Sequence, residues 1–474
     1  MSKHKVYIAI LVVLVLAGSI TAQGTIPSIT AVYYENGSVM VYQQSRDETI
    51  TLLTADEIPE GAYVNASLAP DSSYVGVIVE QISINIFSYP ENLSGQTIET
   101  ADLTNKLYLF SLPSGEKILE RNTLTDDFVI EFFMPGVLLE PILESNIGVS
   151  WSPNSSRAAW IEGTPHTGEH NGFGQLVIFN TSDSSVTELG AHDGTPYDLY
   201  WSPDGQYAVY QAVTNFGTGA GISTSGSYVL LPDNTTRPLP LPERENVSSK
   251  TISPHGWLSE TQFVFSMFSP YDGAAGLSVY DVSTDTQVDI VPFDVELTYS
   301  GTTIQPKTGQ IVATFAGYQI LDDVHPGTYL FRSITSAPEL IYQDETNEGA
   351  DRAAFISSDM VYLYTYDPDM PYHVIYNTTT NEITPEPRIT DYAYTTSHGA
   401  IFTYNDGGVT MIHPLSEDDL PVELPGVTPD TLTWLSDTVF VSYSDTMIHI
   451  ATTMGDLYTI ALPNATTIFD VKGE

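Results

Sequence analysis

The feature that most constrains this chain is a short phrase that recurs along it. Its clearest copy, Trp201-Ser202-Pro203-Asp204-Gly205, stands between two apolar stretches. Proline presets the backbone for the first central position of a tight turn, and aspartate or glycine completes it, so the phrase reverses the chain between two strands. Looser copies keep this frame at residues 68–72, 151–155, 252–256, 304–308, 356–359, 396–399 and 434–437.

The spacing of these copies indicates the architecture. After the first step, successive copies lie about 38 to 52 residues apart, which is the period of a four-stranded propeller blade. Each turn is followed by a β-branched and aromatic run of strand length, such as residues 207–210. A second hairpin closes most units, with turns at residues 113–115, 182–183, 283–285 and 377–379. Each repeating unit is therefore expected to contain four strands.

The pattern therefore predicts an all-β chain that forms one β-propeller of four-stranded antiparallel blades. Eight copies of the phrase favour eight blades, with seven or nine as the alternatives. Further strands are expected at residues 31–34, 38–42 and 49–53, and at 467–471 near the other end of the chain. Strands from both ends in one blade would close the ring without an exposed edge.

The repeated Trp-Ser-Pro-Asp-Gly phrase resembles the WD40-like, TolB-type propeller repeat. The resemblance covers nearly all of the chain after the first 22 residues, and it implies architecture rather than activity. TolB itself carries an α/β domain ahead of its propeller, whereas strand-like sequence begins here at about residue 29. Only the repeat is shared, so the resemblance implies no Tol-system role.

The first 22 residues read as a secretory signal peptide. Two lysines and a histidine lie within residues 1–5, an apolar run covers residues 6–17, and Ile20-Thr21-Ala22 resembles a cleavage site. The apolar run is shorter than the ~20 residues needed to span a bilayer. We expect residues 1–22 to be removed and residues 23–474 to form the propeller. The mature protein is then secreted, periplasmic or at the cell surface, without a transmembrane span.

Charge and cysteine content exclude several partners and sites. The chain has 59 Asp and Glu against 15 Lys and Arg, and its net charge of -44 argues against nucleic acid or anionic lipid as a partner. The acidic residues are scattered, which fits either a solvated acidic exterior or cation binding. The lack of cysteine excludes disulfides, thiolate metal sites and a cysteine nucleophile. The oligomeric state is left open.

Asparagine placement has two interpretations. Half of the eighteen asparagines begin an Asn-x-Ser/Thr sequon, at positions 36, 65, 92, 154, 180, 234, 246, 377 and 464. Asn, Ser and Thr are favoured in turns for local hydrogen bonding, so composition alone can generate much of this pattern. Glycosylation in a host with the machinery is the other interpretation.

The longer connections indicate one functional face. With the strands of a blade labelled A to D from the centre outward, the B-to-C and D-to-A connections lie on one face, and the A-to-B and C-to-D turns on the other. Loops built out on one side of a rigid scaffold are where binding and catalysis usually reside. The extra residues are in B-to-C connections at 81–104, 163–174, 213–225, 267–276, 317–327 and 366–371, and in one D-to-A connection at 121–146.

These connections hold the candidate site residues. His166 and His170 belong to a His-x-x-Glu-His string, but the surrounding glycines and proline exclude the helix that a catalytic zinc site needs, leaving a ligand contact or a solvated loop. Aromatic side chains could stack on sugar rings or anchor a peptide, or could pack loops onto blades. These aromatic candidates are Phe173, Phe216, Tyr271 and Tyr318. Oxygen and imidazole groups that could contact a ligand or hold a divalent cation such as calcium are Asp322, Asp323, His325, Asp367 and Asp369.

Enzyme and binding-module interpretations then have to be weighed. The chain lacks a Gly-x-Ser-x-Gly elbow, and its arginines are too few and scattered for a sialidase-type substrate clamp. A glycosidase needs two carboxylates about 5–5.5 Å or 6.5–9.5 Å apart, and a sequence cannot show such convergence. We therefore predict an exported, non-catalytic propeller that binds a protein, peptide or glycan through the B-to-C and D-to-A face. The alternative is a carboxylate-based glycosidase or lyase with its site at the channel mouth.

Overall fold

The computed structural model describes most of the chain. The described residues are 27–81, 97–98, 105–124, 128–129, 132–134, 137–138, 148–163, 174–189, 194–215, 223–241, 251–269, 273–297, 301–315, 325–343, 348–364, 373–386, 389, 393–397, 400–404, 410–414, 421–427, 431–453 and 455–474. They form β-strands almost throughout, with one 3-10 turn, η1 (Gln44–Arg46). The expectation of an all-β chain is confirmed.

The strands assemble into antiparallel units of four, which we number along the chain. The first three units are β40 (Ala465–Gly473), β1 (Ile29–Glu35), β2 (Ser38–Gln43) and β3 (Glu48–Leu53); β4 (Tyr63–Leu68), β5 (Tyr74–Glu80), β7 (Asn105–Ser111) and β8 (Glu116–Asn122); and β12 (Ser150–Trp151), β13 (Arg157–Gly163), β14 (Gly174–Asn180) and β15 (Val186–Glu188).

The next three units are β16 (Thr195–Trp201), β17 (Ala208–Asn215), β18 (Ser223–Leu230) and β19 (Thr236–Pro238); β20 (Ile252–Trp257), β21 (Gln262–Ser269), β22 (Gly273–Asp281) and β23 (Thr286–Leu297); and β24 (Thr303–Gln305), β25 (Gln310–Phe315), β26 (Gly327–Phe331) and β27 (Glu339–Tyr342). The fifth and sixth units join into one eight-stranded sheet through the single pair Leu297 and Phe315.

The last three units are β28 (Arg352–Phe355), β29 (Met360–Tyr364), β30 (His373–Asn377) and β31 (Glu382–Pro385); β32 (Ala393–Ser397), β33 (Ala400–Tyr404), β34 (Thr410–Pro414) and β35 (Val422–Leu424); and β36 (Thr433–Trp434), β37 (Val439–Tyr443), β38 (Met447–Thr452) and β39 (Leu457–Ala461).

The described residues thus make eight large sheets that comprise nine four-stranded units. Eight units correspond to the eight copies of the phrase, and the ninth is the unit shared by the two ends of the chain. The blade count lies within the predicted range of seven to nine. The excess over eight is explained by the terminal unit, whose β40-to-β1 step carries no phrase because the chain does not run continuously through it.

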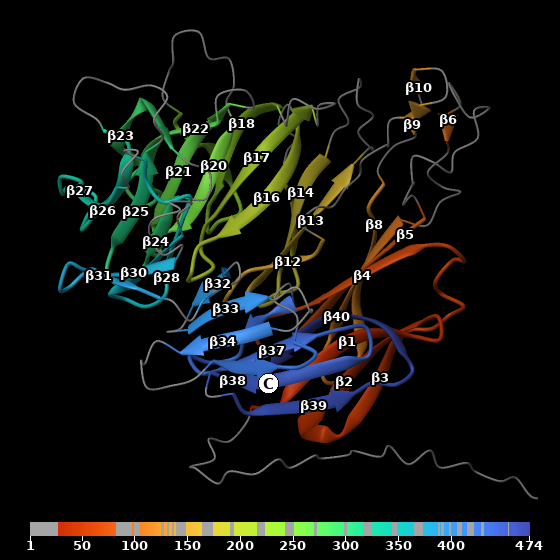
Figure 1. Ribbon diagram of the computed structural model, residues 1–474. Coiled ribbons are helices and arrows are strands. Elements are labelled where there is room, and N and C mark those ends of the chain that lie inside the picture. The colour runs from red at the N-terminus through yellow and green to blue at the C-terminus, as the bar shows by residue number, and fades with distance from the viewer. Residues whose placement is uncertain are drawn as a thin grey trace, which may run out of the picture.

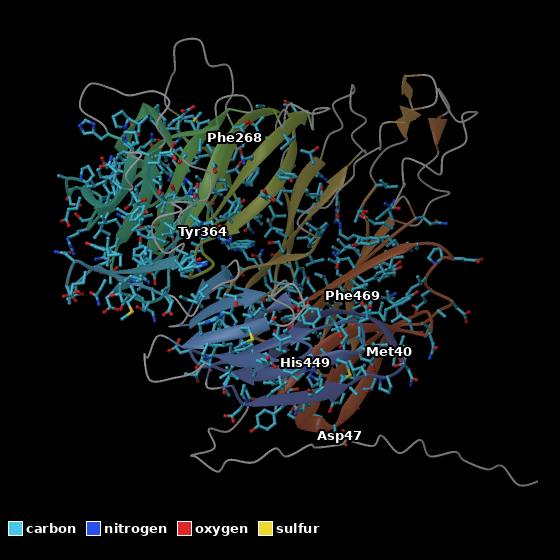
Figure 2. All side chains as sticks on the ribbon, in the orientation of Figure 1. Met40, Asp47, Phe268, Tyr364, His449 and Phe469 are labelled. Atoms are coloured by element: carbon cyan, nitrogen blue, oxygen red, sulfur yellow. The ribbon has the colours of Figure 1, made fainter. Side chains whose placement is uncertain are left out.

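The first strand of each unit lies toward the centre of a ring. β40 lies beside β4, β20 beside β24, and β24 beside β28, so the first strands of successive units are neighbours. Figure 1 shows the strands of the first unit, β40 and β1 to β3, together although they come from opposite ends of the chain. In Figure 2, Met40 of β2 and Phe469 of β40 likewise lie in one region of the molecule.

Nine hydrophobic clusters hold the described part of the ring together, one between each pair of neighbouring units. Val32 of the first unit packs in a cluster with Val77 of the second, and Ile29 of the first packs in another with Val441 of the ninth. The remaining clusters join the other neighbours in turn. Because every interface between units has its own core, the β-propeller is closed.

In one copy of the phrase, the proline predicted the turn at the wrong residues. Residues 252–256 lie inside β20 rather than in a turn, and the chain turns between Trp257 and Gln262 instead. The Trp marks the position of the turn better than the proline does, because its indole hydrogen-bonds to the preceding unit at the end of the first strand. Trp257 Nε1 donates to Tyr200 O of the preceding unit at 3.0 Å, as Trp201 Nε1 donates to Ser150 Oγ at 2.9 Å.

Candidate functional site

The face with the A-to-B and C-to-D turns, here the turn face, is a hydrogen-bonded belt. Asn154 Nδ2 donates to Asp204 O at 2.6 Å, which joins the third and fourth units. Gln305 Nε2 donates to Ser357 O at 2.9 Å, which joins the sixth and seventh. Ser72 Oγ donates to Gly473 O at 2.9 Å and ties the second unit to the end of β40. These polar groups are used by the fold itself.

The glycine of the clearest phrase copy is fixed by this belt. Gly205 has φ +69°, a conformation that favours glycine. A Cβ at this position would lie 2.6 Å from Asn154 Oδ1. At the fourth unit, the contacts of the turn face therefore serve the fold.

The opposite face, here the loop face, carries the long connections. The predicted B-to-C connections all run between the second and third strands of their units, for example from β5 to β7 and from β25 to β26. The D-to-A connection from β8 to β12 contains β9 (Phe128–Val129) and a hairpin of β10 (Phe132–Met134) and β11 (Val137–Leu138). β9 pairs with β6 (Thr97–Ile98) of the B-to-C connection of the second unit. These short strands stand apart from the blades (Figure 1).

Most predicted site residues lie outside the described part of the chain and stay predictions. They are His166, His170, Phe173, Phe216, Tyr271, Tyr318, Asp322, Asp323, Asp367 and Asp369. His325 is described: it is exposed, and its backbone O accepts a 2.8 Å hydrogen bond from Tyr329 Oη. Within the described residues, no group of three His, Asp or Glu side chains could hold a metal ion.

One aromatic on the loop face was missed by the sequence reasoning. Tyr63 begins β4, the innermost strand of the second unit, directly after a D-to-A connection. It is 51% exposed, which is unusual among the large aromatics of the described residues. Tyr63 follows residues 54–62, a D-to-A connection outside the extended connections that the sequence indicated. An exposed tyrosine at the entry of an inner strand can stack on a ligand held at this face.

Asp198, on the inner strand of the fourth unit, is a second missed candidate. It has φ +50° and lies in a bulge of β16 between the pairs made by Tyr197 and Tyr200. Burial raises the pKa of its carboxyl, although Tyr200 Oη donates a 3.3 Å hydrogen bond to Asp198 Oδ2. Left-handed backbone at a non-glycine residue and a perturbed carboxyl are both enriched at functional sites.

His255 occupies the bulge of the next inner strand, β20. Its Nε2 is 2.7 Å from Ser266 Oγ on β21. The pKa of His255 is lowered to about 4 by burial, so the ring is neutral near pH 7. Ser266 is fully buried and cannot reach a substrate, so the pair is not a serine nucleophile with its base. A signal for both positions existed in the sequence, since Asp198 and His255 precede a Trp of the phrase by three and two residues.

Comparisons with known proteins add little beyond the fold. No family model matches the chain, and no curated protein matches it. A structure described as the eukaryotic initiation factor is similar with a TM-score of 0.48 and 13% identity, over 94% of this chain and 98% of that one.

Two further solved structures are similar at lower scores. The β-propeller domain of the Trilobed protease from Pyrococcus furiosus has a TM-score of 0.33 and 10% identity, over 84% of this chain and 97% of that one. A chain of the Mitotic Checkpoint Complex has a TM-score of 0.30 and 12% identity, over 71% and 81%. Similarity at this level carries no argument about function.

The described residues also include no helix of the length and apolarity that would cross a membrane.

Proposed function

We propose that this β-propeller, with a WD40-like, TolB-type repeat, is an exported protein that binds a protein, peptide or glycan ligand at its loop face. Residues 1–22 serve as its signal peptide, residues 23–474 form the propeller, and the mature protein is secreted, periplasmic or at the cell surface.

One observation carries this proposal, namely the contrast between the two faces. On the turn face, polar groups of neighbouring units are joined to one another. The long connections leave from the loop face, and the exposed Tyr63 marks the start of an inner strand there. Loops on one side of a rigid scaffold commonly form a binding site.

Binding is tested with the purified mature protein on glycan and peptide arrays. We expect Tyr63→Ala, and alanine substitution of Phe173, Phe216, Tyr271 and Tyr318, to weaken the signal at least tenfold. Leu340→Ala is the matched control, because Leu340 is 50% exposed but lies on β27, the outer strand of the sixth unit. The proposal fails if the loop-face variants bind as the wild type does, or if Leu340→Ala loses as much.

The cation version of the site has its own test. If Asp322, Asp323, His325 and Asp369 hold calcium, mass action makes the melting temperature rise with metal concentration. We expect added calcium to raise it and a chelator to lower it, and Asp322→Asn with Asp323→Asn to abolish both effects. If calcium, zinc and chelator all leave the melting temperature unchanged, the proposal of a bound metal ion fails.

Asp198 gives a specific reason to keep the glycan-active enzyme as second candidate. A carboxyl whose pKa is raised can act as the general acid of glycoside cleavage. If the protein releases reducing ends from a panel of polysaccharides, Asp198→Asn should abolish the release, and Asp289→Asn on the outer strand β23 should not. Absence of release leaves the binding function.

A further inference from the structure

The environment of the asparagine amide separates five of the seven sequons in the described residues into two groups. We propose that Asn36 and Asn464 are N-glycosylation sites, which lie side by side on one edge of the first unit. The inference rests on the proposed export, because the transferase and its lipid-linked oligosaccharide act on exported chains.

Asn36 stands in the turn of the β1–β2 hairpin. Asn36 and Gly37 have φ +50° and +81°, which is the conformation of a two-residue type I′ turn. Asn36 is exposed, and its Nδ2 makes one long contact of 3.5 Å with Glu35 Oε1. The amide nitrogen that must be glycosylated is therefore open to solvent, and Ser38 follows at the required spacing.

Asn464 stands in the turn between β39 and β40. Ala465 N donates to Leu462 O at 2.9 Å across this turn, and the Asn464 side chain is exposed. The Thr of its sequon, Thr466, is exposed as well. Among the described residues, no hydrogen bond of the Asn464 side chain is found.

The two sites are neighbours in space although they are far apart in the chain. Glu35 pairs with Ala465 in the β1–β40 register, so the two asparagines lie just beyond the same pair. Thr466 Oγ1 also donates to Tyr34 O at 3.3 Å, which couples the second sequon to the strand of the first. Glycans attached at both would share the loop-face end of the first unit, where the β1–β2 and β39–β40 connections are short.

Three sequons on the turn face have their amides engaged in the fold. Asn154 Nδ2 donates to Asp204 O at 2.6 Å, and Asn180 Nδ2 donates to Ser185 Oγ at 2.9 Å. Asn234 is 9% exposed, and its Oδ1 accepts from Arg157 at 3.3 Å. A glycan on any of these nitrogens would break contacts between or within units, so these three sequons are expected to stay unmodified.

The modification has a balanced chemistry. The amide nitrogen attacks the anomeric carbon of an oligosaccharide carried on a lipid phosphate or pyrophosphate. A carbon–nitrogen bond forms, the bond from that carbon to the phosphate oxygen breaks with the lipid phosphate as leaving group, and the amide gives up one proton to a base of the transferase.

The test is secretion of the full chain from an N-glycosylating host, followed by glycopeptide mass spectrometry. A host leader replaces residues 1–22 in one version, while the natural leader is kept in another. We expect glycan mass on the peptides with Asn36 and Asn464 and none on those with Asn154, Asn180 and Asn234. Ser38→Ala should remove the first glycan and Thr466→Val the second, each without affecting the other. Thr235→Ala, which keeps Asn234 but changes only the middle residue of its sequon, is the matched control and should leave the pattern unchanged.

Two results would overturn the proposal. One is bare Asn36 and Asn464 in secreted protein while a reference glycoprotein from the same cells carries its glycans; the other is glycan on Asn234. Failure of only the natural-leader version to be secreted would count against export, and the glycan pattern of the other version would still decide the sites.

Discussion

At the scale of single residues, two turn glycines distinguish backbone strain from a side-chain clash as causes of lost stability. Gly205 and Gly309 have nearly equal φ values, +69° and +71°, and both belong to A-to-B turns. A Cβ on Gly205 would collide with Asn154, whereas a Cβ on Gly309 would meet no atom within 4 Å. The first substitution therefore carries backbone strain and a clash, and the second carries strain alone.

We predict that Gly309→Ala lowers the free energy of unfolding by about 1 kcal/mol. Gly205→Ala should cost at least about 1 kcal/mol more, because Asn154 must move and its hydrogen bond to Asp204 O is lost. Urea denaturation of both variants measures the difference. Equal losses would show that Asn154 yields freely, and a change in ligand affinity without a loss of stability would place the turn face in the site.

The half-buried His255 predicts a dependence of stability on pH. Its folded pKa of about 4 lies below the ordinary value of 6.5, because burial disfavours the charged ring. The unfolded chain binds more protons between these values, so this contribution is complete above pH 6.5 and is lost as the pH falls toward 4. We expect His255 to account for about 2–3 kcal/mol of the loss between pH 7 and pH 4.5.

The measurement compares urea denaturation of three proteins at the two pH values. His255→Gln, which can keep a hydrogen bond to Ser266, should lose less stability on acidification than the wild type. His325→Gln is the control, because His325 is exposed and should leave the slope unchanged. Titration of the many carboxylates is common to all three. An unchanged slope in His255→Gln would contradict the assignment.

At the scale of the elements, arginines clamp neighbouring units. Arg157 of β13 is buried, and its guanidinium donates to Gly205 O at 2.7 Å and to Leu231 O at 3.1 Å, both in turns of the fourth unit. It also lies 4.8 Å from the centre of the Trp201 ring. Burial lowers the pKa of Arg157 to about 10, so the charge is retained at neutral pH.

We predict that Arg157→Lys lowers the free energy of unfolding by about 2–4 kcal/mol, because one ammonium cannot reach both turns and the carbonyls stay buried. Arg332→Lys is the matched control. Arg332 joins the sixth and seventh units through Thr378 O at 2.8 Å, but its side chain is 36% exposed, so the loss should stay within about 1 kcal/mol. Similar losses in the two variants would contradict the role of burial.

The same scale shows what could be predicted from the sequence. Strands and turns follow local rules, so the phrase located the turn after Trp201 and the second hairpins correctly. The turn of the fifth unit was misplaced because Pro254 lies inside β20, paired with Phe265 of β21 and next to the bulge at His255. Asp198 and His255 were missed for a similar reason, since the bulges that hold them arise from strand pairing and not from the local sequence. The candidates in the long connections lie outside the described residues and stay predictions.

At the scale of the whole molecule, closure of the ring depends on the pairing of β1 with β40. Asp470 Oδ2 of β40 accepts a 3.0 Å hydrogen bond from Leu68 N of the second unit, and Tyr443 Oη of the ninth donates to Phe469 O at 2.9 Å. The last strand therefore contacts both neighbouring units as well as β1. The chain carries a net charge of -44, so its acidic side chains repel one another and oppose the compact state. The pairing and contacts of β40 counteract this repulsion where the two ends of the chain meet.

A designed disulfide tests this closure most directly, because the chain has no cysteine of its own. Tyr34 and Thr467 are paired residues of β1 and β40, and paired Cα atoms lie about 4.5–5.5 Å apart, within disulfide range. Tyr34→Cys with Thr467→Cys should form an intramolecular bond on mild oxidation. Tyr34→Cys with Thr379→Cys, on the exposed turn of the seventh unit, should keep two free thiols. Two free thiols in the first pair, or bonds only between chains, would contradict the closed ring.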